Sequence, residues 1–169
     1  MPVGAYCGSA AVMSKISPDG EVYQAGTLSG NPVAMAAGIA QLTECLKPGF
    51  YKKLEEKTIA FTNALNDYAE AKHYLFRVFS IGSIFWFAFT GSASIKSAKD
   101  IDPESMNSFA RFYHLLLERG IYMGPSGYEV GFISEAHTKK ILHETRNLIM
   151  ECLDIIRPSK PRADRRVSG

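Results

Sequence analysis

The sequence predicts an α+β fold in which helices pack against one small sheet. Two kinds of pattern alternate along residues 45–157: long stretches with apolar residues at helical spacing, and short runs rich in aromatic and β-branched residues. Their order is helix, strand, strand, helix, strand, strand, helix, which is typical of an α+β layer. Residues 1–44 do not continue this pattern, and we expect them to belong to a different domain.

The helices are predicted from apolar spacing and from signals at their ends. Within residues 50–71, apolar side chains recur at helical spacing among charges, at Leu54, Phe61, Leu65 and Tyr68. A second helix is predicted over residues 102–117, with Pro103 at its first position and Gly120 just past its end. A third helix covers about residues 137–156.

The strands are predicted from short runs with a period of two. Residues 75–90 predict two strands joined by a tight turn at residues 82–83. We expect the phenylalanines of this stretch to form the core and not a ligand site: Phe76, Phe79, Phe85, Phe87 and Phe89. Two shorter strands are predicted at residues 121–123 and 130–133, around a turn at residues 124–127.

The first 44 residues predict an edge strand, a loop and a helix. Residues 1–8 open without a helix start signal and predict a strand broken by glycines. Residues 32–42 predict a helix rich in small residues, with Asn31 as its N-cap and Pro32 at its first position. The expected domains are a remnant of a larger domain at 1–44 (strand, phosphate loop, helix), a small α+β domain at 45–157, and a disordered basic tail at 158–169.

Composition excludes several classes of function. The 169 residues are 46% hydrophobic and 21% charged, and the formal net charge of +2 gives no global field that favours nucleic acid or an anionic membrane. No apolar run approaches about 20 residues, so no membrane span is expected. Three widely spaced cysteines and four histidines predict neither a disulfide framework nor a metal site. We expect a cytoplasmic protein, and an organelle stays open because we expect the true amino terminus to be missing.

The loop at residues 26–31 (GTLSGN) carries the ingredients of an anion site. Gly26, Thr27 and Leu28 offer a hydroxyl and backbone N–H groups just before a helix that starts with proline. A pattern this short is also that of a turn whose hydroxyls bond their own backbone. The residues alone favour the turn and leave a phosphate or carboxylate site as the alternative.

Three motifs, in order along the chain, resemble the glutamate-1-semialdehyde 2,1-aminomutases, class III relatives of the aminotransferases. They are residues 2–6 (PVGAY), residues 23–32 (YQAGTLSGNP) and residues 125–138, which contain PS, EVGFIS and AHT. The resemblance runs from Met1 to about Ile156 and is most specific in residues 23–32. It implies the carboxy-terminal portion of a pyridoxal-phosphate-dependent homodimer of aspartate-aminotransferase-like fold type I. Such an isomerase acts in porphyrin (tetrapyrrole) biosynthesis and converts glutamate-1-semialdehyde to 5-aminolevulinate.

The resemblance also implies roles for individual residues. Gly26, Thr27 and Leu28 would reach the phosphate of pyridoxal 5'-phosphate bound by the other subunit of the dimer. Glu129 would project toward the amino groups of the substrate, where a carboxylate accepts from an ammonium. The Schiff-base lysine of the family would lie upstream of Met1, so no catalytic residue is assigned within this chain. We expect the chain alone to be inactive and not to bind the cofactor by itself.

Other functions stay open. The nearest is an ω-aminotransferase of the same class, and residues 23–32 together with Glu129 favour the aminomutase over it. A non-catalytic binding or dimerisation module would retain apolar surface on residues 1–44. A nucleic-acid accessory protein would use the basic residues of the tail, 159–169, and would bind in a salt-sensitive way.

Overall fold

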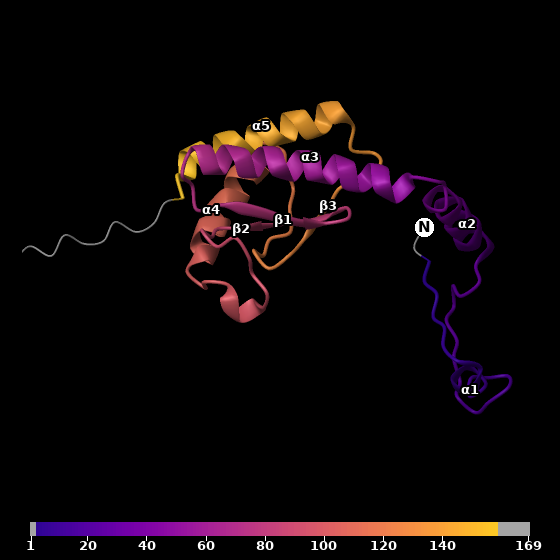
Figure 1. The fold of residues 1–169 in the computed structure, drawn as a ribbon. Coiled ribbons are helices and arrows are strands. Elements are labelled where there is room, and N and C mark those ends of the chain that lie inside the picture. The colour runs from indigo at the N-terminus through magenta and orange to yellow at the C-terminus, as the bar shows by residue number, and fades with distance from the viewer. Residues whose placement is uncertain (1–2, 159–169) are drawn as a thin grey trace, which may run out of the picture. The chain divides into compact units, whose positions relative to one another are not determined.

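Helices and a small sheet make up the computed structural model, which describes residues 3–158 (Figure 1). The chain divides into two units, Met1–Phe50 and Tyr51–Gly169, and each is described by itself. The predicted α+β class is confirmed, because the described helices accompany a three-stranded antiparallel sheet. The tail predicted to be disordered lies, from residue 159 onward, outside the described residues.

The main element of the first unit is helix α2 (Pro32–Cys45). Asn31 caps this helix as predicted, since its side-chain oxygen accepts the N–H groups of Val33 at 3.0 Å and Ala34 at 3.2 Å. Pro32 lies in the first turn, where its missing N–H removes no helical hydrogen bond. The start of α2 is therefore determined locally by two adjacent residues.

The strand predicted at residues 1–8 is not formed over its described part, residues 3–8. Residues 3–8 have no regular secondary structure, and the short helix α1 (Ala10–Met13) follows them. Strand pairing in the described part of this unit is limited to one parallel bridge between Ile16 and Val22. A strand persists only where neighbours satisfy its N–H and C=O groups, and the described chain offers residues 3–8 no such neighbour.

The second unit holds the other helices and the sheet. In order, its elements are α3 (Phe50–Ala71), β1 (Arg77–Ile81), β2 (Ile84–Ala88), the 3-10 helix η1 (Ala98–Asp100), α4 (Ser105–Glu118), β3 (Gly131–Phe132) and α5 (Lys139–Ile156). The helix predicted at residues 50–71 is confirmed at both ends. Helix α4 begins later than predicted because Pro103 forms a tight turn, in which its C=O accepts the N–H of Met106 at 3.1 Å. Helix α5 begins after Thr138, whose hydroxyl accepts the N–H of Ile141 at 3.2 Å.

The sheet has the strand order β1-β2-β3, and both neighbouring pairs are antiparallel. The predicted tight turn between β1 and β2 is confirmed, with Gly82 at a φ of +55°. Asn66 of α3 partly closes the outer edge of β1. Its amide donates to the C=O of Val78 at 2.9 Å, and its side-chain oxygen accepts the N–H of Val78 at 2.7 Å. These bonds occupy backbone groups that could otherwise pair with another strand.

The strand predicted at residues 121–123 is not formed, and β3 is shorter than the run predicted at residues 130–133. The N–H of Ile121 donates to the C=O of Leu116 at 2.9 Å, after Gly120 at a φ of +77° has ended α4. A backbone group that is bonded at a helix end cannot pair in a sheet. The side chain of Ile121 instead packs against the core.

Aromatic rings fill the core between the sheet and the helices. Ring centroids lie 5.4–5.7 Å apart in the contacting pairs of one cluster, formed by Phe76, Phe87, Phe89 and Phe112. Phe85, also predicted in the core, is buried as well. Phe79 is the exception: it is half-buried and stacks on Trp86 at 5.7 Å, on the opposite face of the sheet. Within residues 3–158, every helix falls short of the length or apolar character that crossing a membrane requires.

Candidate functional site

Two tight turns follow each other in the loop that the sequence predicts as an anion site. The N–H of Ser29 donates to the C=O of Gly26 at 2.9 Å, and the N–H of Asn31 donates to the C=O of Leu28 at 3.1 Å. Gly30 takes a φ of +69°, a left-handed conformation that favours glycine. A Cβ on Gly26 would lie 2.8 Å from the hydroxyl oxygen of Ser29. Glycines at both positions therefore allow the chain to turn twice within six residues.

Thr27 and Leu28 lie at the tip of these turns and face solvent; Leu28 is 73% exposed. Within residues 3–158, no protein group pairs with the Thr27 hydroxyl, with its N–H or with the N–H of Leu28. The next donors along the chain, the N–H groups of Val33 and Ala34, are already bonded to Asn31. Three donors in two adjacent residues are thus free to bind an external anion, and a phosphate group fits this donor set.

Glu129 lies in the second unit, in a turn that leads into β3. The C=O of Ser126 accepts the N–H of Glu129 at 3.0 Å, and the Ser126 hydroxyl accepts the N–H of Tyr128 at 3.3 Å. The Glu129 side chain folds over the backbone of Gly124, where a Cβ would collide with its carboxylate. The residue is exposed, and no donor among the described residues contacts its carboxylate. The carboxylate can therefore accept hydrogen bonds from a ligand.

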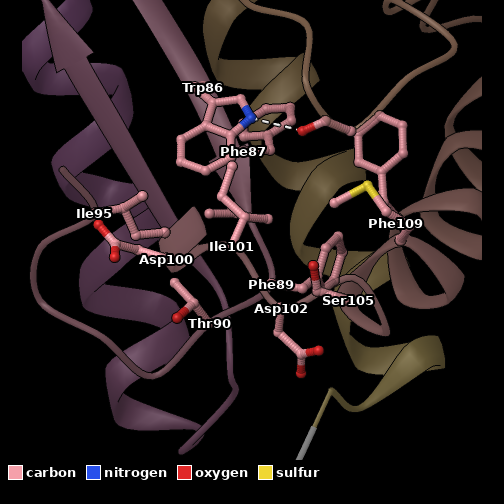
Figure 2. A pocket seen from close by; sticks show the side chains of 13 residues that line it. Trp86, Phe87, Phe89, Thr90, Ile95, Asp100, Ile101, Asp102, Ser105 and Phe109 are labelled. Atoms are coloured by element: carbon pink, nitrogen blue, oxygen red, sulfur yellow. Dashed lines mark hydrogen bonds between the residues drawn. The ribbon is translucent and has the colours of Figure 1, made fainter. Parts of the chain in front are cut away.

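The turn before Glu129 is anchored to the sheet. The indole N–H of Trp86 on β2 donates to the C=O of Gly127 at 2.7 Å, shown as the dashed line in Figure 2. A Cβ on Gly127 would lie 2.7 Å from the sulfur of Met106 and 3.0 Å from the ring of Phe109, so a larger residue would require these α4 side chains to shift. The crevice beside these groups has a volume of about 10 Å³, which is room for about one water molecule. The crevice is therefore too small for a substrate of several atoms.

The structure brings three of the four predicted site residues together. Gly26, Thr27 and Leu28 are consecutive in one turn of the first unit, whereas Glu129 belongs to the second unit. Within residues 3–158, no group of three or more His, Cys, Asp or Glu side chains is arranged to hold a metal ion.

The described lysines differ in how far they are from solvent. Lys57 on α3 is the least exposed, with 19% of its side chain accessible. Its ammonium lies 3.3 Å from the C=O of Ser134, 3.4 Å from the C=O of Glu135 and 3.4 Å from the Glu135 carboxylate. The other described lysines are exposed. None of the lysines among residues 3–158 is fully buried.

The chain belongs to the class III aminotransferase family, whose model matches residues 1–156. Members of this family use pyridoxal 5'-phosphate, and the chain adopts their pyridoxal-phosphate transferase fold. The family match covers both units, including the turn at Thr27 and the turn at Glu129.

Solved structures of several enzymes resemble this chain. An ω-transaminase from Sphaerobacter thermophilus has a TM-score of 0.73 and 23% identity, over 89% of this chain and 34% of that one. A β-phenylalanine aminotransferase from Variovorax paradoxus has a TM-score of 0.73 and 25% identity, over 87% and 34%. A glutamate-1-semialdehyde aminomutase from Pseudomonas aeruginosa PAO1 has a TM-score of 0.67 and 19% identity, over 86% and 33%. The chain therefore spans about a third of the length of these enzymes.

Proposed function

We propose that this chain supplies the phosphate-binding turn and a substrate carboxylate to a glutamate-1-semialdehyde 2,1-aminomutase. The observation that carries the proposal is the turn at residues 26–31, which presents three free donors within the motif that resembles this family most closely. Glu129, in a second motif of the resemblance, adds an exposed carboxylate without a partner among the described residues. The family match over residues 1–156 includes both motifs, and it supports their interpretation as a cofactor-binding turn and a substrate-binding carboxylate.

In this proposal the turn binds the phosphate of pyridoxal 5'-phosphate. The Thr27 hydroxyl and the N–H groups of Thr27 and Leu28 donate to its oxygens, and Gly26 keeps the turn tight. The cofactor supplies the electron sink that the exchange of an amino group requires. The turn reaches a cofactor held by the other subunit of a homodimer. The proposed location of this enzyme is the cytoplasm.

Glu129 orients the substrate. An aminomutase handles an intermediate that carries two amino groups, and a carboxylate accepts strong hydrogen bonds from an ammonium. The anchored turn supports this role, because the bond from Trp86 to Gly127 holds the backbone two residues before Glu129. A fixed backbone limits the positions that the carboxylate can take.

The chain alone is not catalytic in this proposal. The reaction needs a lysine that is held neutral near the cofactor, and the described lysines are exposed or, as with Lys57, bonded to oxygen acceptors. In this proposal the lysine belongs to another part of the parent enzyme.

An ω-aminotransferase of the same class is the second candidate. It is favoured by the β-phenylalanine aminotransferase of Variovorax paradoxus, which at 25% identity is nearer in sequence than the aminomutase of Pseudomonas aeruginosa at 19%. The two candidates share the fold and the cofactor, so an assay of substrate must separate them.

The test begins with the coding DNA before Met1 and with expression of the longest in-frame protein that contains this chain. We expect a lysine followed by Gly-Gly-Gly just upstream, and conversion of glutamate-1-semialdehyde to 5-aminolevulinate without an external amino donor. Glu129→Gln should lower kcat/KM by roughly 10-fold to 100-fold through loss of a charged hydrogen bond. Glu118→Gln, an exposed change on α4, should leave kcat/KM unchanged. Transfer to a keto acid from an external amine, without 5-aminolevulinate formation, would instead identify an ω-aminotransferase.

A further inference from the structure

A groove runs between α3 and α5, which lie side by side in Figure 1. Its volume is about 540 Å³, within the range of small-molecule sites. Ala60, Phe61 and Leu142 form its apolar lining. Glu129 is not among the described residues that line the groove, so an inference about it does not depend on the proposed function.

Positive charge predominates along the groove. Four cationic side chains line it, Lys53, Lys57, Lys139 and Arg146, against two carboxylates, Glu56 and Glu135. Both carboxylates already have cationic neighbours: Lys57 lies 3.4 Å from Glu135, and Lys52, outside the lining, lies 4.0 Å from Glu56. Among the described residues, Lys53, Lys139 and Arg146 form no ion pair. The groove therefore has three cations available to a ligand.

Arg146 has an unused donor. Its Nε is buried and has no hydrogen-bond partner among the described residues, while one terminal nitrogen lies 2.9 Å from Nδ1 of His143. A guanidinium presents its N–H groups as a planar fork that matches a carboxylate or another oxyanion. Because the Nε has almost no accessible surface, a ligand oxyanion in the groove would contact the terminal nitrogens of the guanidinium.

The end of α5 reinforces the positive potential. Lys139 is the first residue of this 18-residue helix, and the amino-terminal end of a helix carries partial positive charge. A ligand anion near Lys139 would gain from both the side chain and the helix dipole. The apolar lining beside these cations would suit the hydrocarbon part of the same ligand.

We propose that the groove between α3 and α5 binds an amphipathic organic anion, with its acidic group at Arg146 and Lys139 and its apolar body against Phe61 and Leu142. Charge complementarity selects the anion, and the apolar lining selects an aryl or alkyl body over a small inorganic ion. The surface is a ligand site that works independently of pyridoxal phosphate.

The test titrates the full chain with naphthalene-2-sulfonate, followed by calorimetry and by amide chemical shifts. We expect one site, with shifts concentrated on the groove-lining parts of α3 and α5. Naphthalene-2-methanol, which lacks the charge, and sodium sulfate, which lacks the ring, should each bind at least tenfold more weakly. Arg146→Gln with Lys139→Gln should weaken binding of the sulfonate at least tenfold.

The matched control is Lys96→Gln with Lys140→Gln, which removes the same charge from exposed positions outside the groove lining and leaves Lys52 paired with Glu56. Its affinity should stay within twofold of the unchanged chain. Lys53→Gln with Lys139→Gln alters only exposed groove side chains, and it replaces the first variant if loss of Arg146 unfolds the chain. Equal weakening by groove and control variants, equal binding of the uncharged naphthalene, or shifts centred elsewhere would overturn the proposal.

Discussion

At the scale of single residues, long-range contacts position the candidate substrate carboxylate. Glu129 lies two residues after Gly127, and Gly127 is held by the Trp86 indole on one side and by α4 on the other. The contact joins residues 41 positions apart in the chain. This geometry makes Gly127 the residue whose replacement most directly tests how the turn is held.

Gly127→Ala should destabilise the second unit by about 1–3 kcal/mol, because its Cβ must displace Met106 and Phe109 from a packed site. Urea unfolding of the full chain measures the loss. Gly91→Ala serves as the control, since the Cβ there meets only the tip of Leu75, at 3.0 Å, and we expect a change below about 0.5 kcal/mol. Equal stability of the two variants would show that the turn is not tightly held.

A second set of residues ties α3 to α5 through one carboxylate. Asp154 accepts the hydroxyls of Tyr68 at 2.7 Å and Tyr74 at 2.8 Å, and the Lys72 ammonium lies 3.7 Å away. The bonds from the two tyrosines hold the pKa of Asp154 below its usual value. Burial, and then the bond to Asp154, raises the pKa of Tyr68 to about 12 and also raises the pKa of Tyr74.

These shifts predict a plateau in stability against pH. The contribution of ionised Asp154 is fully present above its ordinary pKa of 3.8 and is lost as the pH falls through its lower folded-state value. The contribution of neutral Tyr68 is fully present below its ordinary pKa of 10.0 and is lost as the pH rises toward about 12. Urea unfolding at about pH 3, 7 and 11 should therefore give the highest stability at the middle value.

The double change Tyr68→Phe with Tyr74→Phe should remove most of this dependence, and it should lower stability near neutral pH by about 1–3 kcal/mol. Tyr128→Phe, at an exposed tyrosine, should leave the profile as it is. If the stability of the double variant fell as steeply at low and high pH as that of the unchanged chain, the Asp154 contacts would be ruled out as the cause of the pH dependence.

The sequence predicts residue roles that depend on neighbours in the chain better than roles that depend on contacts between distant segments. Asn31 and Pro32 were identifiable as helix-start residues because a cap acts within three residues. One side of the groove was also recognisable in the sequence. Lys139, His143 and Arg146 recur at helical spacing and therefore lie on one face of α5. The bond from Trp86 to Gly127 has no such local signature, because it depends on how distant elements pack.

At the scale of elements, the helices followed their sequence patterns and two of the predicted strands did not form. Helix α3 begins and ends as predicted because the pattern of apolar residues within 50–71 is sufficient to define one face. Residues 3–8 and 121–123 have strand-like sequences but pair with no described strand. Strand formation depends on a partner, and single-strand patterns do not reveal whether one exists.

Asn66 closes part of one edge of the sheet, and its replacement tests that role. Asn66→Ala should destabilise the chain by about 1–3 kcal/mol, because the N–H and C=O of Val78 would lose their partners. Asn63→Ala changes an exposed asparagine of the same helix and should shift stability by less than about 0.5 kcal/mol. Thermal unfolding compares the two, and amide exchange at Val78 should speed up only in the first. Unchanged exchange at Val78 in Asn66→Ala would contradict the role.

At the scale of the whole molecule, the two units differ in what they bury. The main hydrophobic cluster lies entirely within the second unit, between Phe61 and Ile156. In the first unit α2 buries only Ala34 and Gly38, and large apolar side chains such as Tyr23, Leu28 and Ile39 are exposed. In the proposed parent enzyme, this exposed apolar surface would contact further protein. It is consistent with a chain that spans about a third of the enzymes that it resembles.

The central proposal is that the turn at Thr27 contacts the cofactor phosphate only in the assembled enzyme, and that none of the lysines among residues 3–158 bonds the cofactor aldehyde. The most direct test incubates the full chain with pyridoxal 5'-phosphate, reduces the mixture with borohydride and maps modified peptides by mass spectrometry. We predict only scattered, substoichiometric labelling across exposed lysines, with Thr27→Ala and the unchanged chain giving the same lysine pattern. Near-stoichiometric labelling of one lysine, lost when Thr27 is replaced, would contradict the claim.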